Sequence, residues 1–258
     1  MSNLPRFHCP TALQTGDVLN LPAGTARHVQ VLRLQPEDEI CLFNGEGGEF
    51  RALIQHMGRS DVSVRVGDKR NIERELSVRV NLWASMMANE RMDWLVEKAT
   101  ELGASNLVPI TAERSILKLK GERADKKLAH WQAIAVAASE QCGRNRVLQM
   151  ATPLNLSQAI ASLMPAPLQR PLWILSLSPG AISLQKAMEK LHQAPLASDP
   201  QAQTRLEVIL LSGPEGGLSP AEEALALASG FQPVTLGPRV LRAETAPIAV
   251  LSALNCWD

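Results

Sequence analysis

The fold of this chain is best decided by residues 210–222, which read Leu210-Leu211-Ser212-Gly213-Pro214-Glu215-Gly216-Gly217-Leu218-Ser219-Pro220-Ala221-Glu222. The apolar start of this stretch predicts the end of a buried strand, and a glycine-rich loop follows it. Ser219 and Glu222 have the spacing of a capping box, with Pro220 at the first helical position. A strand, a glycine-rich loop and a helix in this order predict an α/β domain in which another molecule can approach the loop backbone closely.

The glycine-rich loop lacks two common nucleotide-binding signatures. A dinucleotide fingerprint needs G-x-G-x-x-G and a phosphate loop needs G-K-[ST], and residues 213–219 contain neither. This spacing argues against a nicotinamide enzyme. Taken alone, the loop fits either a structural turn or a ligand-binding loop.

A second turn of the same kind follows the strand predicted at residues 233–236. Gly237-Pro238 forms the turn, and Arg242-x-Glu244 leads to a last helix predicted at residues 248–256, with Thr245 as its cap. A local ion pair between Arg242 and Glu244, with a structural role only, also fits this spacing. Two glycine-containing loops at the carboxyl ends of strands in one sheet nevertheless favour a ligand crevice.

The regions on either side of these loops predict two domains. From residue 76 onward, strand-like segments alternate with amphipathic helical stripes, and Gly103 is placed as a helix C-cap. The predicted strands are 76–84, 106–110, 172–177, 207–211 and 233–236, the helical stripes are 92–102 and 128–142, and 164–171 and 193–204 are predicted loops. Mainly apolar strands of this kind predict a mainly parallel sheet.

The amino-terminal region predicts a small β-barrel. Residues 39–43 and 50–54 read as a hairpin around the turn at 44–48, and residues 61–66 alternate polar and apolar side chains. The polar segment 67–75 is the predicted linker. The expected domains are therefore residues 1–72 and residues 73–258.

Composition restricts the possible classes of protein. The chain has 258 residues, 45% of them hydrophobic, with 26 basic and 26 acidic side chains, which is typical of one or two globular domains and not of a disordered chain. No apolar run is long enough to span a membrane, and the first residues lack the apolar core of a signal peptide. A cytoplasmic protein is therefore expected. Four widely spaced cysteines predict neither a zinc site nor a disulfide framework, and no metal is expected.

The zero net charge argues against a protein that coats nucleic acid, but the charge is unevenly distributed. Residues 114–146 contain eight basic and three acidic side chains. A solvated helix face and a nucleic-acid surface both fit this excess.

A series of motifs extends over nearly the whole chain. They are Pro5-Arg6-Phe7-His8, His28 with Val31-Leu32-Arg33-Leu34, Glu97-Lys98-Ala99-Thr100-Glu101-Leu102-Gly103, Glu113-Arg114-Ser115, Glu140-Gln141-Cys142-Gly143-Arg144-Asn145-Arg146-Val147, the loop from Gly213 to Gly217, and Leu236-Gly237-Pro238-Arg239-Val240-Leu241-Arg242-x-Glu244-Thr245. Together they resemble the RsmE family, the 16S ribosomal RNA uridine-N3-methyltransferases of the knotted SPOUT class.

The resemblance implies a fold, a cofactor and an assembly. A PUA-like RNA-binding barrel would occupy residues 1–72. Residues 73–258 would form a SPOUT methyltransferase domain, a parallel sheet with helices on both faces whose carboxyl-terminal segment is threaded into a trefoil knot. Two subunits of a homodimer would together bind S-adenosylmethionine, without a metal. The cofactor contacts carried over by the motifs are Leu175, Leu177, Leu211, Gly213, Pro214, Glu215, Gly216, Gly217, Leu236, Gly237, Val240 and Leu241.

One departure from the family concerns the first of the cofactor loops. The family often has Leu-His-Pro there, whereas this chain has Leu175-Ser176-Leu177-Ser178-Pro179. A polar contact through that histidine is not expected here, although backbone contacts can persist.

The implied reaction is methylation of N3 of a specific uridine in 16S ribosomal RNA, within the assembled small subunit. Loss of the N3 proton spreads negative charge onto the flanking carbonyl oxygens, which a guanidinium can stabilise. We therefore assign Arg242 as catalytic, with Glu244 holding Arg242 or relaying the proton. Phosphate contacts are assigned to basic side chains, namely Arg6, Arg33, Arg114 and Arg144.

Two alternatives stay open at this point. A SPOUT enzyme that methylates a ribose 2′-hydroxyl would use the same fold and loops. A non-catalytic RNA-binding ribosome-assembly factor could also retain the fold, although the intact Gly213 loop and the Arg242-x-Glu244 segment speak against lost activity.

Overall fold

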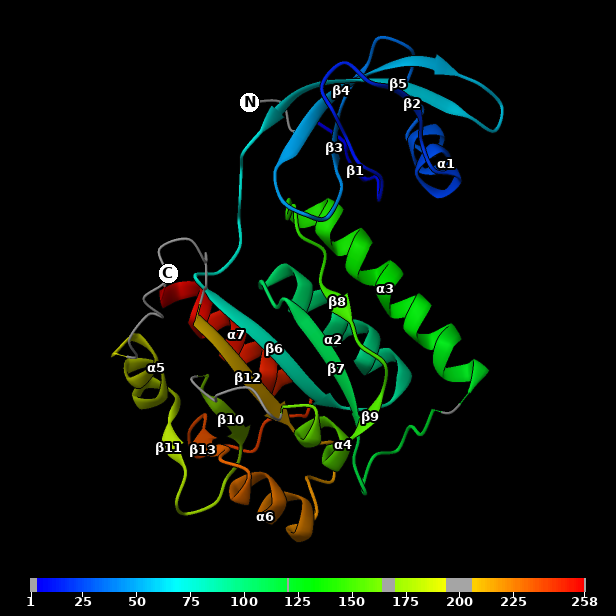
Figure 1. Ribbon diagram of the computed structural model, residues 1–258. Coiled ribbons are helices and arrows are strands. Elements are labelled where there is room, and N and C mark those ends of the chain that lie inside the picture. Colours follow the sequence, from blue (N-terminus) through cyan, green and yellow to red (C-terminus); the bar gives the residue numbers. More distant parts are fainter. Residues whose placement is uncertain (1–3, 120, 164–169, 194–205, 258) are drawn as a thin grey trace. The chain divides into compact units, whose positions relative to one another are not determined.

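A computed structural model of the chain describes residues 4–119, 121–163, 170–193 and 206–257. The predicted loops at 164–171 and 193–204 lie largely outside these residues. The chain divides into two compact units (Figure 1). Residues 1–75 and 136–147 form the first, and residues 76–135 and 148–258 form the second.

Among the described residues, the first unit contains a five-stranded sheet, a helix of its own and the end of a longer helix that is described below. The strands are β1 (Arg6–His8), β2 (Val18–Asn20), β3 (Glu39–Phe43), β4 (Glu49–Met57) and β5 (Val62–Arg70), in the order β1-β3-β4-β5-β2, and the helix is α1 (Ala23–Val31). β1 runs parallel to β3, and the other neighbours are antiparallel. The predicted hairpin of β3 and β4 is confirmed.

Alternation along these strands explains the core of the first unit. Ile40 and Leu42 on β3, and Ile54 on β4, are fully buried together with Phe7. Residues two apart on a strand lie on the same face of the sheet, so the apolar side chains of one face can pack against α1. The predicted linker at 67–75 is partly wrong, because β5 continues through Arg70, and the segment without helix or strand before the next strand is 71–77. The pairing of β4 with β5 extends as far as Glu49 and Arg70, which keeps this polar segment in the sheet.

The second unit is an α/β domain with a parallel sheet, as predicted. Its strands are β6 (Val78–Ser85), β7 (Asn106–Thr111), β8 (Gln149–Met150), β9 (Leu154–Asn155), β10 (Leu172–Leu175), β11 (Ile182–Ser183), β12 (Leu206–Ser212) and β13 (Gln232–Thr235). Their order is β11-β13-β10-β12-β6-β7-β8, with β9 also paired to β7. Every pairing in this sheet is parallel.

Helices pack on this sheet. They are α2 (Asn89–Glu101), α3 (Glu122–Cys142), α4 (Leu156–Ala161), α5 (Leu184–Gln193), α6 (Pro220–Ala228) and α7 (Thr245–Trp257). Residues 136–142 of α3 belong to the first unit and the rest of this helix to the second.

The central strands are buried on both faces. Trp83, Ile209 and Leu211 share a core cluster with side chains of α4 and α6. The alternate positions Leu82 and Leu210 are also fully buried, and α7 packs against β6 and β12 and also against α2. Because side chains alternate between the two faces of the sheet, the apolar residues of these strands pack against helices on both faces (Figure 1).

Several element ends differ from the prediction. β10 ends at Leu175 and β13 at Thr235, earlier than expected, so more residues are available to the loops that follow. Thr245 was expected to cap the last helix but is its first residue. The predicted C-cap is confirmed, since Gly103 has φ +89° and the amide of Ala104 bonds the Ala99 carbonyl at 2.9 Å. Among the described residues, no helix combines the length and apolar character that crossing a membrane requires.

Candidate active site

A cavity of about 520 Å³ lies at the carboxyl ends of β10, β12 and β13 in the second unit. Because these strands are parallel, the loops that follow them meet at one edge of the sheet. Side chains and backbone of all three loops line the cavity, together with Arg91 of α2 and Glu223 of α6. The two loops singled out in the sequence therefore meet at one site.

The glycine-rich loop is held in a tight turn. Gly217 has φ +68°, a left-handed conformation that favours glycine, and its amide bonds the Pro214 carbonyl at 2.8 Å. A Cβ at Gly213 would lie 3.1 Å from the Leu218 amide nitrogen. The two backbone segments can therefore approach this closely because residue 213 has no side chain. The predicted capping box of Ser219 and Glu222 is confirmed, with Pro220 as the first helical residue.

The loop after β7 anchors the glycine-rich loop. Arg114 donates from Nη1 to the Gly216 carbonyl at 3.0 Å and to the Leu218 carbonyl at 3.4 Å. The Glu222 carboxylate accepts from the Glu113 amide at 2.8 Å as well as from the Ser219 amide at 2.9 Å. Arg114 thus has a positioning role at the loop, while its contact with RNA stays a prediction.

The departure from the family motif also lies in the cavity wall. Ser176 donates from Oγ to Glu223 Oε1 at 2.7 Å, and the Ser178 amide donates to Ser176 Oγ at 3.1 Å. Both Ser176 and Glu223 line the cavity. A hydroxyl–carboxylate pair therefore lies in the loop where this chain departs from the Leu-His-Pro expected from the resemblance.

Arg242 and Glu244 have different surroundings. Arg242 is exposed, lines the cavity and, within the described part of the chain, takes part in no ion pair. Glu244 is largely buried, its Oε1 lies 3.8 Å from Arg91 Nε, and its Oε2 is buried without a hydrogen-bond partner among the described residues. The local Arg242–Glu244 ion pair is thus not formed, and Glu244 faces Arg91 instead.

Arg91 is the residue that the sequence pattern missed. Its Nη1 also lies 3.2 Å from Glu215 Oε1, so it contacts carboxylates of both glycine-containing loops. One signal could have found it: Arg91 is the third residue of a helix, where the helix dipole disfavours a cation. A cation at this position suggests nearby carboxylates.

Ten of the fourteen predicted catalytic and cofactor-binding residues line the cavity, namely Leu175, Leu177, Gly213, Pro214, Glu215, Gly217, Leu236, Val240, Leu241 and Arg242. The other four do not. Leu211 is fully buried in the core of the sheet, and Gly216 packs against Arg114. Gly237 forms the left-handed turn after β13 with φ +105°, and Glu244 lies within ion-pair distance of Arg91.

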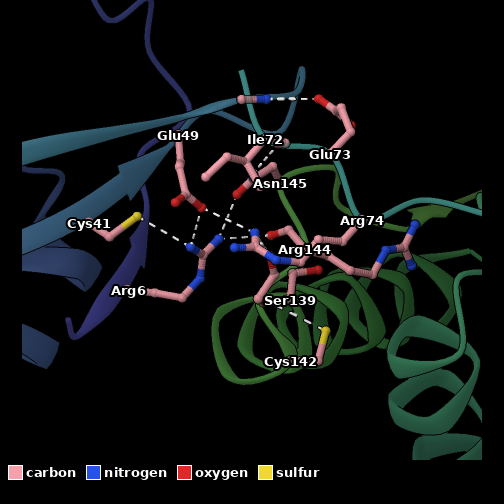
Figure 2. A network of polar contacts seen from close by, with 12 residues as sticks. Arg6, Cys41, Glu49, Ile72, Glu73, Arg74, Ser139, Cys142, Arg144 and Asn145 are labelled. Carbon is pink, nitrogen blue, oxygen red and sulfur yellow. Dashed lines mark hydrogen bonds and ion pairs between the residues drawn. The ribbon is translucent and has the colours of Figure 1, made fainter. Parts of the chain in front are cut away.

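Two predicted RNA-binding residues lie in a buried polar network of the first unit (Figure 2). Arg6 donates to Glu49 Oε2 and to Asn145 Oδ1, both at 2.6 Å. Arg144 pairs with Glu75 through Nε at 2.9 Å. Only 9% of the Arg6 side chain and 3% of the Arg144 side chain are exposed. Because a buried guanidinium must keep its carboxylate partner, this geometry favours structural roles, and RNA contact by these two residues stays a prediction.

The remaining RNA-binding candidate has an open position. Arg33 is exposed and has a left-handed backbone with φ +57°, just after α1. Its guanidinium can therefore meet a phosphate without breaking a buried pair.

Comparison with known proteins identifies relatives along nearly the whole chain. The model of the RNA methyltransferase domain family matches residues 74–255, and that of the RNA methyltransferase PUA domain matches residues 21–67. Ribosomal RNA small subunit methyltransferase E of Bacillus subtilis (strain 168) is 32% identical over 228 residues, which are 88% of this chain and 85% of that protein.

Two solved structures are also similar. A methyltransferase from Legionella pneumophila, in complex with the bound cofactor SAM, has 32% identity and a TM-score of 0.85, covering 99% of this chain and 98% of that one. Ribosomal RNA small subunit methyltransferase E from Neisseria gonorrhoeae, bound to S-adenosyl methionine, has 30% identity and a TM-score of 0.84 with the same coverage.

These relatives agree with the fold described above. The predicted fold class, a SPOUT-type α/β domain preceded by a PUA-like domain, is confirmed, while the threading of the knot stays a prediction. The family model spans most of the chain, and the named relatives cover both units. The chain therefore belongs to the RNA methyltransferase family, among the proteins named ribosomal RNA small subunit methyltransferase E.

Proposed function

We propose that this protein transfers the methyl group of S-adenosylmethionine to N3 of a specific uridine in 16S ribosomal RNA. The observation that carries the proposal is the cavity itself, because residues of the glycine-rich loop and of the loop bearing Arg242 both line it. The relatives' names support ribosomal RNA as the substrate, and their bound cofactor supports S-adenosylmethionine.

The residues of the cavity fit this cofactor. A volume of about 520 Å³ lies within the usual range of small-molecule sites, roughly 300 to 1,000 Å³. Leu175, Leu236 and Leu241 offer an apolar wall suited to adenine, and the Gly213 to Gly217 backbone offers polar groups at close approach. When bound, the cofactor supplies a methyl group on a positively charged sulfur, which is already activated and needs no metal. No cluster of three or more His, Cys, Asp and Glu side chains in the described ranges is arranged to hold a metal ion.

The chain's own side chains would act on the uracil ring. Arg242 lines the cavity, and its guanidinium can donate hydrogen bonds to the uracil carbonyl oxygens, which gain negative charge when N3 loses its proton. Glu244 does not line the cavity itself but follows the lining residue Ala243, and its unpartnered Oε2 would accept that proton, or a hydrogen bond from N3, from a base that reaches past the lining. The base must first leave any stack, which costs a few kcal/mol, less where it is already unpaired.

The wider assembly forms part of the proposal. We assign RNA binding to residues 1–72 and methyl transfer to residues 73–258, and we expect a homodimer that acts on the small subunit in the cytoplasm, where ribosomal RNA is found. Exposed basic side chains, Arg33 in the first unit and Lys118 and Arg123 in the second, are the favoured phosphate contacts.

The proposal is tested on substrate that lacks the modification. Small subunits and naked 16S RNA from cells without the gene are incubated with the purified protein and isotopically labelled S-adenosylmethionine, and the digested nucleosides are identified by mass spectrometry. We expect labelled 3-methyluridine from one site. A 2′-O-methylated nucleoside, or no label, would overturn the assignment.

A further inference from the structure

One guanidinium, that of Arg91, contacts a carboxylate from each of the two glycine-containing loops, the loop after β12 and the loop after β13. We infer that Arg91 is a positioning residue for the proposed methyl transfer, which places Glu244 relative to the glycine-rich loop by bridging Glu244 and Glu215. The inference rests on the proposed function and assigns a further residue to it.

The position of Arg91 follows from the fold. It is the third residue of α2, the helix that follows β6, and the carboxyl ends of β6 and β12 lie side by side with Ala84 opposite Ser212. Its side chain is 37% exposed and lines the cavity. A cation in the first turn of a helix gains nothing from the helix dipole, so the two carboxylates are what stabilise it there.

The two contacts differ in kind. Arg91 Nη1 donates to Glu215 Oε1 at 3.2 Å, which is a hydrogen-bonded ion pair. Arg91 Nε lies 3.8 Å from Glu244 Oε1, which is an ion pair without a direct hydrogen bond. Glu215 belongs to the glycine-rich loop, and Glu244 directly precedes α7, so the guanidinium joins segments that are far apart in the sequence.

Glu244 depends on this contact. Its side chain is only 13% exposed, and Arg91 is the cation within ion-pair distance of it in the described part of the chain. A mostly buried carboxylate without a cation would be costly, and its orientation would not be set. With Oε1 directed to Arg91, Oε2 is the atom that has no hydrogen-bond partner among the described residues, so it is the one left to accept from a base that reaches past the cavity lining.

The bridge predicts two separable effects. Through Glu244 it sets the group that handles the N3 proton, and this affects kcat. Through Glu215 it supports the glycine-rich loop, which Arg114 holds independently at Gly216 and Leu218, so the cofactor site should survive its loss. Arg91 therefore acts mainly on turnover.

The test is a double-mutant cycle on the full-length protein with S-adenosylmethionine and undermodified small subunits. The variants are Arg91→Met, Glu244→Gln and the double variant. Arg91→Lys and Glu215→Gln separate charge from geometry, and Arg79→Met removes an exposed arginine on β6 that does not line the cavity. Cofactor affinity is measured for each by calorimetry, which also reports folding of the site.

We expect Arg91→Met to lower kcat by about 10- to 100-fold with less than about a fivefold change in the KM for the cofactor. In the Glu244→Gln background, Arg91→Met should lower kcat by less than about a further threefold. The reason is that the carboxylate through which Arg91 acts has already been removed. Arg91→Lys should restore part of kcat, since it returns the charge without the planar fork. Arg79→Met should match the unmodified protein.

The inference would be overturned if the losses of kcat caused by Arg91→Met and Glu244→Gln multiplied in the double variant, which would show that the two residues act independently. It would also be overturned if Arg91→Met left kcat unchanged or changed only the cofactor affinity. Failure of the proposed function is a separate result. If the unmodified protein methylates another position, the uridine-N3 assignment falls while the cycle still reports the coupling of Arg91 to Glu244. If it forms 3-methyluridine and the cycle shows no coupling, only the role of Arg91 falls.

Discussion

Arginines that look alike in the sequence differ in what surrounds their guanidinium groups. Arg242 is exposed at the cavity, so its donors are available to a bound base. Arg114 donates to two backbone carbonyls of the glycine-rich loop. Arg144 is 3% exposed and paired with Glu75. The surroundings of each guanidinium, more than the residue type, therefore separate the catalytic role proposed for Arg242 from the positioning and structural roles proposed for the others.

Replacing Arg242 should strongly lower turnover while cofactor binding is retained. Arg242→Ala removes the donors for the charge that develops on the uracil oxygens, and we expect kcat to fall by about 10²- to 10³-fold. Cofactor affinity, measured by calorimetry, should change only a few-fold, because Arg242 is one of many lining residues. Arg242→Lys serves as the charge-retaining control and should recover part of the rate. Near-normal turnover by Arg242→Ala would contradict the assignment.

Ser176 provides a prediction about the cofactor wall. Ser176→Ala removes the hydroxyl that donates to Glu223 at 2.7 Å and accepts the Ser178 amide. Loss of a hydrogen bond to a charged group should weaken cofactor binding by about 1 to 2 kcal/mol, roughly 5- to 30-fold in Kd. Ser178→Ala is the matched control, because Ser178 contributes its backbone amide to this contact. Equal affinities of the two variants would show that the Ser176–Glu223 pair does not shape the site.

At the scale of elements, short-range signals place helix and loop ends. Ser219, Pro220 and Glu222 start α6 as a capping box, and Gly103 ends α2 with a left-handed residue. Glu222 also accepts the Glu113 amide, so the cap that starts α6 ties the glycine-rich loop to the loop after β7. A local capping motif thus has a second role at the active site.

Gly103→Ala should destabilise the protein. An alanine there would hold a left-handed φ at a cost of about 1 to 2 kcal/mol, and its Cβ would lie 2.8 Å from Leu76 Cγ, so a buried side chain must also move. The midpoint of urea unfolding, followed by circular dichroism, should shift to lower urea. Gly24→Ala in α1 is the control: its Cβ would meet nothing within 4 Å, and helix propensity favours alanine there. Equal midpoints for Gly103→Ala and the unmodified protein would contradict this explanation.

At the scale of the whole molecule, the buried network of the first unit joins segments that are distant in the sequence (Figure 2). Arg6, Glu49 and Asn145 come from the first strand, the fourth strand and the segment after α3, and Arg74 donates to the same Glu49 oxygen at 3.2 Å. These contacts explain why residues 136–147 count with the first unit. They also make its stability depend on pH.

Two carboxyl groups of the first unit should contribute pH dependence of opposite sign. Burial opposes ionisation of Glu49, but hydrogen bonds from Arg6 and Arg74 outweigh it and hold the pKa of Glu49 below its ordinary value of 4.5. The unfolded chain then binds this proton more readily, so stability that is present at neutral pH is lost as the pH falls below about 4.5. Burial raises the pKa of Glu140, against the opposing His8 amide and His28, so its contribution is present at low pH and lost as the pH rises through the raised pKa.

Urea unfolding between about pH 3 and pH 7 distinguishes the two groups. Glu49→Gln should lower stability at pH 7 and flatten the acidic decline, whereas Glu140→Gln should steepen it. Each variant serves as the control for the other. The same slope in both variants would contradict the two assignments.

Much of the fold and part of the site can be read from the chain alone. Strand and helix alternation, the capping box at Ser219, the C-cap at Gly103 and the glycine-rich loop depend on residues within a few positions of one another, where propensity and local hydrogen bonding act. The motif resemblance added the cofactor loops, and most of their predicted residues line one cavity.

Tertiary structure alone decided which distant side chains meet. The bridge from Arg91 to Glu215 and Glu244 spans more than a hundred residues, and the burial of Arg6 and Arg144 depends on partners in other strands and loops. An ion pair has no sequence period, and its strength is set by burial and by the few ångströms between two groups, which only the packed chain fixes. The sequence by itself therefore determined the loops and their chemistry, and the fold determined which charges act on a ligand and which hold the protein together.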